Sequence, residues 1–172
     1  MSNVYLVGFM GAGKSSTGRL LARSLDQPFV DLDVHIEETV GLAIPEIFEA
    51  QGEGAFRRYE REALAWTTRV SDAVVATGGG AACDAVNRNI MHASGGRSVF
   101  LDVPWSVLAA RLGQDHGDRP MITTEEEAKR LFEARRPHYQ ESSWTVALTG
   151  RETPEQVVSL VLEILAGVSC AT

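Results

Sequence analysis

Eight consecutive residues near the amino terminus, Gly8-Phe9-Met10-Gly11-Ala12-Gly13-Lys14-Ser15, have the types and spacing of a phosphate-binding loop. Glycines permit positive φ angles, so the backbone N–H groups can approach an anion closely. We expect Lys14 to reach the β- and γ-phosphates of a nucleotide and the Ser15 hydroxyl to ligate Mg²⁺. The alternative is a glycine-rich turn that only joins a strand to a helix.

Two carboxylates follow the next apolar run. Asp31 and Asp33 end the stretch 28–33, and strand alternation predicts that both side chains point to the same side. Phosphoryl transfer needs a carboxylate that orients the metal and a group that accepts the proton of the nucleophile. These aspartates could divide the two tasks, although either could instead cap the following helix.

Glycines and an arginine suggest a second ligand-binding region. Gly78-Gly79-Gly80 follows a buried apolar run, and three glycines in succession suit a backbone that approaches a ligand. Arg57 and Glu60 lie three residues apart in a helical pattern, so the carboxylate could hold the guanidinium ready for an anion. The alternatives are a flexible turn and a surface ion pair of little energetic value.

A third group of candidates lies between residues 113 and 139. The polar, glycine-containing stretch 113–119 ends in Arg119-Pro120 and could be a plain loop or a mobile lid over about 113–124. A lid arginine could neutralise charge on a transferring phosphate. Arg135 ends the next helical pattern, where the helix dipole alone would also favour a cation.

Alternating strand and helix patterns must position these side chains. Apolar runs predict strands at 4–7, 28–33, 73–77, 98–103 and 144–148, and helical spacing predicts helices at 17–25, 55–69, 105–112, 125–139 and 154–165. This order predicts an α/β fold, with a five-stranded, mostly parallel sheet covered by helices on both faces. We expect one domain over residues 1–172.

Composition narrows the function classes. The 172 residues are 44% apolar and 23% charged, and the net charge of −7 argues against a nucleic-acid-binding surface. No apolar run is long enough to span a bilayer, and the amino-terminal residues do not resemble a signal peptide. Two cysteines, far apart in the sequence, are typical of a reducing cytoplasm.

Taken together, these motifs resemble the shikimate kinase family over nearly the whole chain. The resemblance rests on their order and spacing, which are far more specific than any single motif. The matching segments are the P-loop 8–15, Phe29-Val-Asp31-Leu-Asp33, Gly52-Glu-Gly-Ala-Phe-Arg57 with Glu60, Thr77-Gly-Gly-Gly80, Arg119-Pro120 and Arg135-x-Pro137-x-Tyr139. Such enzymes use ATP to phosphorylate the 3-hydroxyl of shikimate, on the route to chorismate and the aromatic amino acids.

The resemblance implies a role for each matching residue. It implies a P-loop kinase with ATP and shikimate as partners, one Mg²⁺, a substrate-binding helical segment at about 33–61, and a monomer in the cytoplasm. Asp33, Lys14 and Arg119 would be catalytic, and Ser15 and Asp31 would hold the metal. ATP would contact Gly11, Ala12, Gly13, Lys14, Ser15, Ser16, Arg119, Arg151 and Pro154, and shikimate would contact Asp33, Arg57, Gly78, Gly79, Gly80 and Arg135.

The chain also departs from the family pattern. An arginine often found seven residues before the lid Arg-Pro is Leu112 here, with Arg111 beside it. A gluconate or nucleoside monophosphate kinase would share the P-loop and often a lid, but lacks the combined aspartate, arginine and glycine motifs. A GTPase would need an Asn-Lys-x-Asp motif, which the sequence does not contain. A non-catalytic relative would not be expected to keep Lys14, Asp33 and Arg119.

Overall fold

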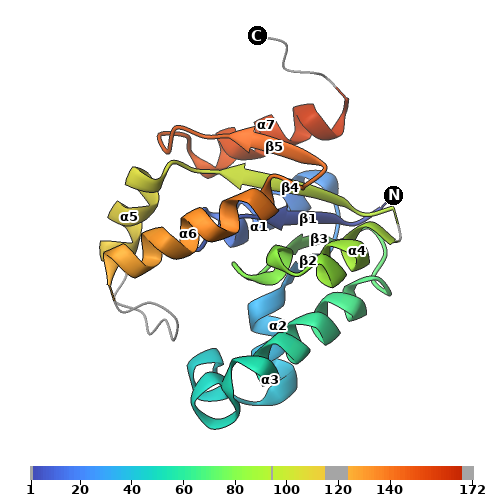
Figure 1. Ribbon diagram of the computed structural model, residues 1–172. Coiled ribbons are helices and arrows are strands. Elements are labelled where there is room, and N and C mark those ends of the chain that lie inside the picture. Colours follow the sequence, from blue (N-terminus) through green and yellow to red (C-terminus); the bar gives the residue numbers. More distant parts are fainter. Residues whose placement is uncertain (1, 94, 115–123, 168–172) are drawn as a thin grey trace.

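A five-stranded sheet forms the centre of the molecule. The computed structural model describes residues 2–93, 95–114 and 124–167. Within them, the strand order is β2-β3-β1-β4-β5, and each neighbouring pair is parallel. The strands are β1 (Val4–Val7), β2 (Phe29–Asp31), β3 (Val74–Ala76), β4 (Arg97–Asp102) and β5 (Trp144–Ala147) (Figure 1). The predicted α/β class and five-stranded sheet are confirmed.

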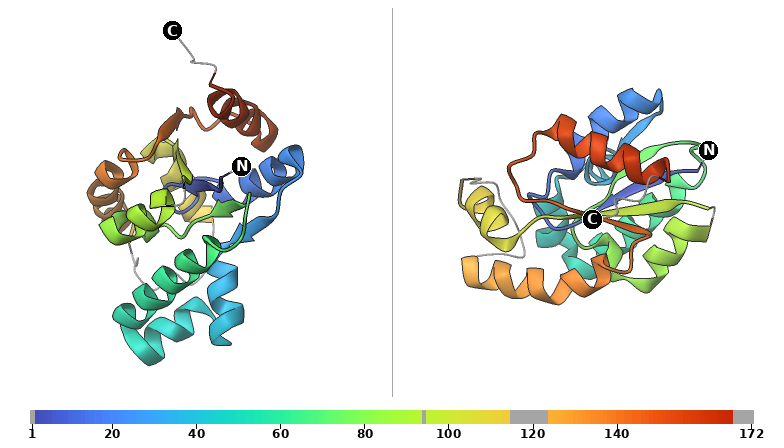
Figure 2. Two further views of the ribbon diagram at one scale, coloured as in Figure 1. Left: turned by 90° about the vertical axis from the view of Figure 1, so that its right-hand side faces the viewer. Right: turned by 90° about the horizontal axis from the view of Figure 1, so that it is seen from above.

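Helices cover both faces of this sheet. Figure 2 shows α1 and α7 on one face and α4 and α6 on the other, while α2 and α3 project beyond the β2 edge. The central strands β1 and β3 are therefore buried along their whole length, and β4 is buried except at its two ends, whereas the edge strands β2 and β5 are partly exposed. The helices are α1 (Lys14–Leu25), α2 (Leu32–Val40), α3 (Ile44–Thr67), the short 3₁₀ turn η1 (Ala81–Cys83), α4 (Ala85–Ala93), α5 (Trp105–Gln114), α6 (Glu125–Tyr139) and α7 (Pro154–Leu165).

The structure corrects the prediction for the two aspartates. Strand β2 ends at Asp31, and Asp33 lies in the first turn of α2 rather than on the strand. The reason is that Leu32 and Ile36, four residues apart, are both fully buried, so helical geometry places them on one inward face. Strand alternation therefore does not apply to Asp33, and the prediction that both carboxylates point to the same side from one strand is wrong.

Helix α3 carries the arginine motif and bends at a glycine. It begins at Ile44, well before the predicted start at residue 55, and Gly52 has φ 79° and ψ 171°, which lies outside helical geometry. A side chain would be strained in this conformation, so the bend depends on glycine. Glu37 of α2 accepts a hydrogen bond of 2.9 Å from the backbone N–H of Ile44, which ties the two helices together.

The core lies around the central strand. Val4, Tyr5, Leu6 and Val7 of β1 are all buried, and the Tyr5 hydroxyl lies 3.1 Å from Thr67 Oγ1 at the end of α3. This contact fixes α3 against the sheet, since a buried hydroxyl needs a hydrogen-bond partner. Within the described ranges, no helix has the length and apolar character needed to cross a membrane.

Gly52→Ala should lower the free energy of unfolding by about 1–3 kcal/mol, because alanine is strained at this φ and ψ. Urea unfolding followed by circular dichroism measures the change. Gly54→Ala is the matched control, since Gly54 lies in the same open surroundings without a positive φ. Alanine at residue 54 should be neutral or stabilising by up to about 1 kcal/mol, and equal effects at both positions would contradict the strain at Gly52.

Candidate active site

The P-loop connects β1 to α1 at the carboxyl edge of the sheet. Gly8, Gly11 and Gly13 have φ angles of 150°, 78° and 88°, as the sequence predicts for a loop that turns its backbone around an anion. Gly13 is the residue directly before α1, so the helix amino terminus adds its positive dipole end to the loop. Within the loop Ala12 is buried, and Ser16 donates a 3.0 Å hydrogen bond to the Gly13 carbonyl.

Lys14 is held inside this loop. Its Nζ donates hydrogen bonds of 2.9 Å to the carbonyl oxygens of Gly8 and Phe9. Burial lowers the pKa of Lys14 to about 8, although the nearby carboxylates of Asp33 and Asp31 oppose this shift. The ammonium group therefore lies where phosphate oxygens could replace the two carbonyls as partners.

Ser15 and Asp31 form a pair beside the loop. The Ser15 hydroxyl donates a 2.6 Å hydrogen bond to Asp31 Oδ2. Both are hard oxygen ligands, the type that Mg²⁺ prefers, and Mg²⁺ in kinase sites takes few protein ligands beside water and phosphate oxygens. Across the described residues, no group of three or more His, Cys, Asp or Glu side chains could hold a metal ion. The Ser15 and Asp31 oxygens thus fit a Mg²⁺ ion that is held together with a nucleotide.

The glycine triplet lies where four charged side chains converge. A methyl group added to Gly78 would lie 2.8 Å from Asp33 Oδ1 and 2.9 Å from Glu60 Oε1. One added to Gly80 would overlap the Arg57 guanidinium, and one on Gly79 would lie 3.7 Å from Arg135 Nη1 and 3.5 Å from the P-loop N–H of Met10. A side chain at residue 78 or 80 would therefore displace one of these charged groups, and glycine lets them approach the backbone this closely.

Arg57 is oriented by two carboxylates of its own helix. Its Nη1 donates to Glu60 Oε2 at 2.9 Å, and its Nη2 donates to Glu53 Oε1 at 3.2 Å. Glu60 is only 1% exposed, so this contact is not the surface ion pair considered as the alternative. Burial raises the pKa of Glu60, while Arg57 opposes the shift.

Helix α6 brings a second arginine to the same place. Arg135 is 8% exposed, near the carboxyl end of α6. The Tyr139 hydroxyl, one turn later, donates a hydrogen bond to the Gly79 carbonyl and fixes the helix to the glycine triplet. Burial raises the pKa of Tyr139 above its usual range, so this hydroxyl keeps its proton.

Asp33 is the carboxylate that faces both halves of the site. Burial raises its pKa, Lys14 and Arg57 oppose the shift, and Asp31 and Glu37 add to it. A carboxylate in such surroundings is a stronger base than one in water, which suits proton removal from a hydroxyl. Asp33 therefore has the environment of a general base.

One residue that contacts the P-loop was not predicted from the sequence. Arg111 of α5 donates a 2.8 Å hydrogen bond from Nη1 to the Gly11 carbonyl, and α5 packs against Gly11 through Leu108 and Leu112. The local sequence around Arg111 does not indicate this contact, because no local pattern predicts that α5 packs against the P-loop. The structure thus places an arginine of this helix at the nucleotide loop, despite the leucine at residue 112.

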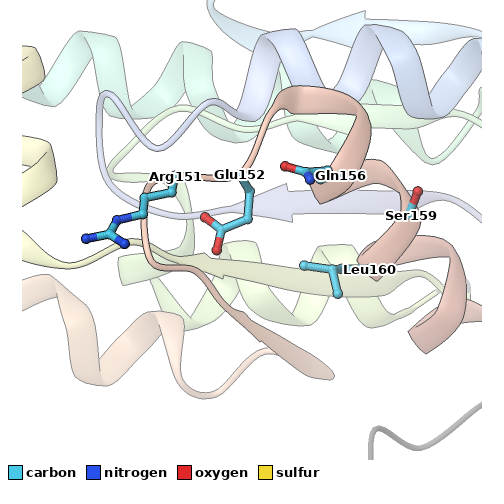
Figure 3. Close-up of a pocket in the computed structure, with 5 residues that line it drawn as sticks. All are labelled: Arg151, Glu152, Gln156, Ser159 and Leu160. Carbon is cyan, nitrogen blue, oxygen red and sulfur yellow. The ribbon is translucent and has the colours of Figure 1, made fainter.

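The segment after β5 lies at the same edge of the sheet. Glu152 accepts hydrogen bonds from Thr149 and Gly150, and those from Thr149 are the main reason that its pKa falls to about 2. Figure 3 shows Arg151 extending away from the α7 residues Gln156 and Leu160. An open hollow of about 520 Å³ lies here, and it is lined by Arg151, Glu152, Gln156, Ser159 and Leu160. Arg151 and Pro154 are both exposed, and their predicted contact with a nucleotide stays a prediction.

Arg119 and most of the predicted lid, residues 115–123, lie outside the described residues. The predicted residues that the structure brings together form two adjacent groups. One group lies around the P-loop and contains Gly11, Ala12, Gly13, Lys14, Ser15, Ser16 and Asp31. The other lies around the glycine triplet and contains Asp33, Arg57, Gly78, Gly79, Gly80 and Arg135. Their predicted contacts with ATP and with shikimate stay predictions.

A family profile, a related sequence and a solved structure that match this chain all carry the same name. A profile described as shikimate kinase matches residues 10–166. A shikimate kinase of Aquifex aeolicus is 40% identical over 165 residues, which cover 95% of this chain and 96% of that protein. A crystallised shikimate kinase from Acinetobacter baumannii, in complex with shikimate, has a TM-score of 0.89 and 34% identity, and the match covers 99% of this chain and 96% of that chain.

More distant structures share the fold alone. A gluconokinase from Sinorhizobium meliloti has a TM-score of 0.63 at 19% identity, with 97% of this chain and 93% of that chain covered. At 19% identity, this likeness shows the fold alone.

Affinity for a nucleoside triphosphate should fall as the pH rises above about 8, because Lys14 then loses the charge that attracts phosphate. Below that pH the ammonium is present, so affinity should be constant. Calorimetric titration with ATP from pH 6.5 to 9.5 measures the change. Lys14→Arg is the control, since guanidinium stays charged throughout, and an equal pH dependence in both proteins would exclude Lys14 as its source.

Proposed function

The chain belongs to the shikimate kinase family, and we propose how its own residues divide the work of that reaction. The enzyme transfers the γ-phosphoryl group of ATP to the 3-hydroxyl of shikimate, a step in the synthesis of chorismate and the aromatic amino acids. The observation that carries the residue assignment is the convergence of Asp33, Arg57 and Arg135 on the glycine triplet, directly beside the P-loop.

The P-loop side holds the phosphoryl donor. Backbone N–H groups of the loop and the α1 amino terminus bind the phosphates, and Lys14 moves from the Gly8 and Phe9 carbonyls to the β- and γ-phosphates. We expect Arg119 to add positive charge at the γ-phosphate, and Arg111, Arg151 and Pro154 to contact the rest of ATP. Ser15 and Asp31 would hold Mg²⁺, which supplies charge neutralisation on the phosphates when bound.

The glycine-triplet side holds shikimate. This substrate has one carboxylate, which the paired guanidinium groups of Arg57 and Arg135 bind. Both arginines are largely withdrawn from water, so their attraction for an anion is stronger than at the surface. The backbone of Gly78, Gly79 and Gly80 lines the pocket, because no side chain separates it from the ligand.

Asp33 removes the proton during transfer. Its assignment is supported by the charges of Lys14 on the donor side and Arg57 on the acceptor side, which are both near enough to lower its pKa. Its carboxylate accepts the 3-hydroxyl proton while the hydroxyl oxygen attacks the γ-phosphorus. To accept this proton, Asp33 must be ionised when shikimate binds, and the nearby cations of Lys14 and Arg57 favour the ionised state.

Charge placement explains how an acidic protein binds two anions. The chain has a net charge of −7, yet Lys14, Arg57, Arg111 and Arg135 all face the strand ends. Clustered cations make the site locally positive and attract ATP and shikimate. We expect the enzyme to act as a monomer in the cytoplasm and to bind neither nucleic acid nor membrane.

A coupled assay of ADP release, with shikimate, gluconate and nucleoside monophosphates offered separately, tests the function. Turnover should occur with shikimate alone, since only this acceptor matches both the carboxylate-binding arginines and the Asp33 carboxylate. Turnover with gluconate or a nucleotide and none with shikimate would overturn the assignment.

Arg57→Ala should raise KM for shikimate about tenfold to hundredfold, because a charge-assisted hydrogen bond contributes about 1.5–3 kcal/mol. KM for ATP should change little. Arg58→Ala is the matched control, since Arg58 is the neighbouring exposed arginine, and it should behave as the wild type. Gly80→Ala should resemble Arg57→Ala, because its methyl group displaces the same guanidinium. A wild-type KM for shikimate in Arg57→Ala would contradict its role.

A further inference from the structure

The Gly11 carbonyl of the P-loop is anchored from outside the loop. Arg111 of α5 donates a hydrogen bond of 2.8 Å from Nη1 to this oxygen. Leu108 and Leu112 of the same helix lie 3.9 Å from the point that a Gly11 side chain would occupy. Helix α5 therefore packs directly against this residue, and Arg111 supplies the polar part of the contact.

The other end of the same peptide group faces the centre of the loop. Gly11 and Ala12 share a trans peptide, whose C=O and N–H point in opposite directions. The Ala12 N–H donates to the Phe9 carbonyl at 3.2 Å, and Lys14 Nζ donates to that same oxygen at 2.9 Å. The amide and the ammonium thus converge on one acceptor oxygen, and a phosphate oxygen in place of this carbonyl would receive a hydrogen bond from each.

Rotation of this peptide would remove the amide from that position. Gly11 has φ 78° and no side chain, so its backbone dihedral angles are less restricted than those of other residues. The hydrogen bond from Ala12 to Phe9 closes a turn, but it would be given up if a phosphate oxygen replaced the Phe9 carbonyl. The bond from Arg111 does not involve this acceptor, so it can hold the peptide in one orientation before and after a phosphate binds.

We propose that Arg111 is a positioning residue for the phosphoryl donor, which fixes the Gly11–Ala12 peptide so that its N–H faces the phosphates. This inference rests on the proposed binding of the ATP phosphates by the P-loop. It differs from a contact between Arg111 and the nucleoside, because its effect passes through Gly11 and reaches any ligand that carries the phosphate chain. It also differs from attraction through space, which salt screens far more than a short hydrogen bond.

Arg111→Met tests the proposal, because methionine keeps an apolar stem against Gly11 and removes the hydrogen-bond donor. The probes are ATP and inorganic tripolyphosphate, each with Mg²⁺. Calorimetric titration measures the affinity for ATP, and competition against ATP measures the affinity for tripolyphosphate. Both affinities should fall by the same factor, about fivefold or more, since the lost bond has a charged donor. KM for shikimate should change little, because the acceptor lies on the other side of the site.

The outcomes separate the alternatives. Weaker binding of ATP with unchanged binding of tripolyphosphate would place Arg111 on the nucleoside and overturn the proposal. A difference between wild type and variant that disappears in about 0.5 M salt would show attraction by charge alone and would also overturn it. Equal affinities of the two proteins for both probes would overturn it as well, since Arg111 would then be a structural contact. A wild type that binds ATP but does not phosphorylate shikimate would contradict the proposed acceptor and leave the test of Arg111 intact.

Two further variants control for charge and for the donor. Arg23→Met removes an equal charge from the exposed last turn of α1 and should bind both probes as the wild type does. A loss there as large as in Arg111→Met would overturn the proposal. Arg111→Lys should bind within about threefold of the wild type, because the contact uses one N–H donor and an ammonium also provides one.

Folding does not confuse these results. Arg111 is only partly buried and methionine is a good helix former, so Arg111→Met should be folded, which circular dichroism checks. If that variant is unfolded, Arg111→Lys decides. Affinities near those of the wild type for both probes support the proposal, and a loss confined to ATP overturns it.

Discussion

The absence of side chains at residues 78 to 80 is the constraint on which the site depends. Parallel strand β3 ends there, and helices from three directions bring charged groups against its backbone. Asp33 and Glu60 approach Gly78 to about 3 Å, and Arg57 occupies the space over Gly80. A single methyl group would displace one of these side chains. The conformational entropy that three glycines lose on folding is offset by the convergence that they permit.

Burial determines the chemistry of the groups that converge. Charged side chains withdrawn from water interact more strongly, and burial also penalises whichever charge is not compensated. Lys14 thereby loses basicity, while Asp33 and Glu60 gain it. These opposite shifts have one physical cause, desolvation acting on charges of opposite sign. The same packing therefore lowers the pKa of the Lys14 ammonium, which can bind phosphate, and raises the pKa of the Asp33 and Glu60 carboxylates, which then bind a proton more readily.

Much of the fold could be predicted from the sequence, because strands buried on both faces are short apolar runs and the P-loop needs a strand before it and a helix after it. Helix α2 could not be predicted from the sequence, since residues 32–40 contain few apolar positions and include Asp33 in the first turn. The buried Leu32 and Ile36 form the apolar face of a helix only because α3 packs against them. Arg111 lacked any local signal, because its contact with Gly11 joins residues 100 positions apart in the chain.

The sequence by itself determined which groups are available: a P-loop with its lysine and serine, two aspartates, three glycines and several arginines in an order typical of one family. Residue type and spacing suffice for this, because the P-loop is a local structure. Only the tertiary structure decided that Asp31 turns to Ser15 while Asp33 turns to Gly78 and Glu60. It also decided which groups lose water, and hence their proton affinities. Desolvation and close approach across elements depend on packing, which no local pattern contains.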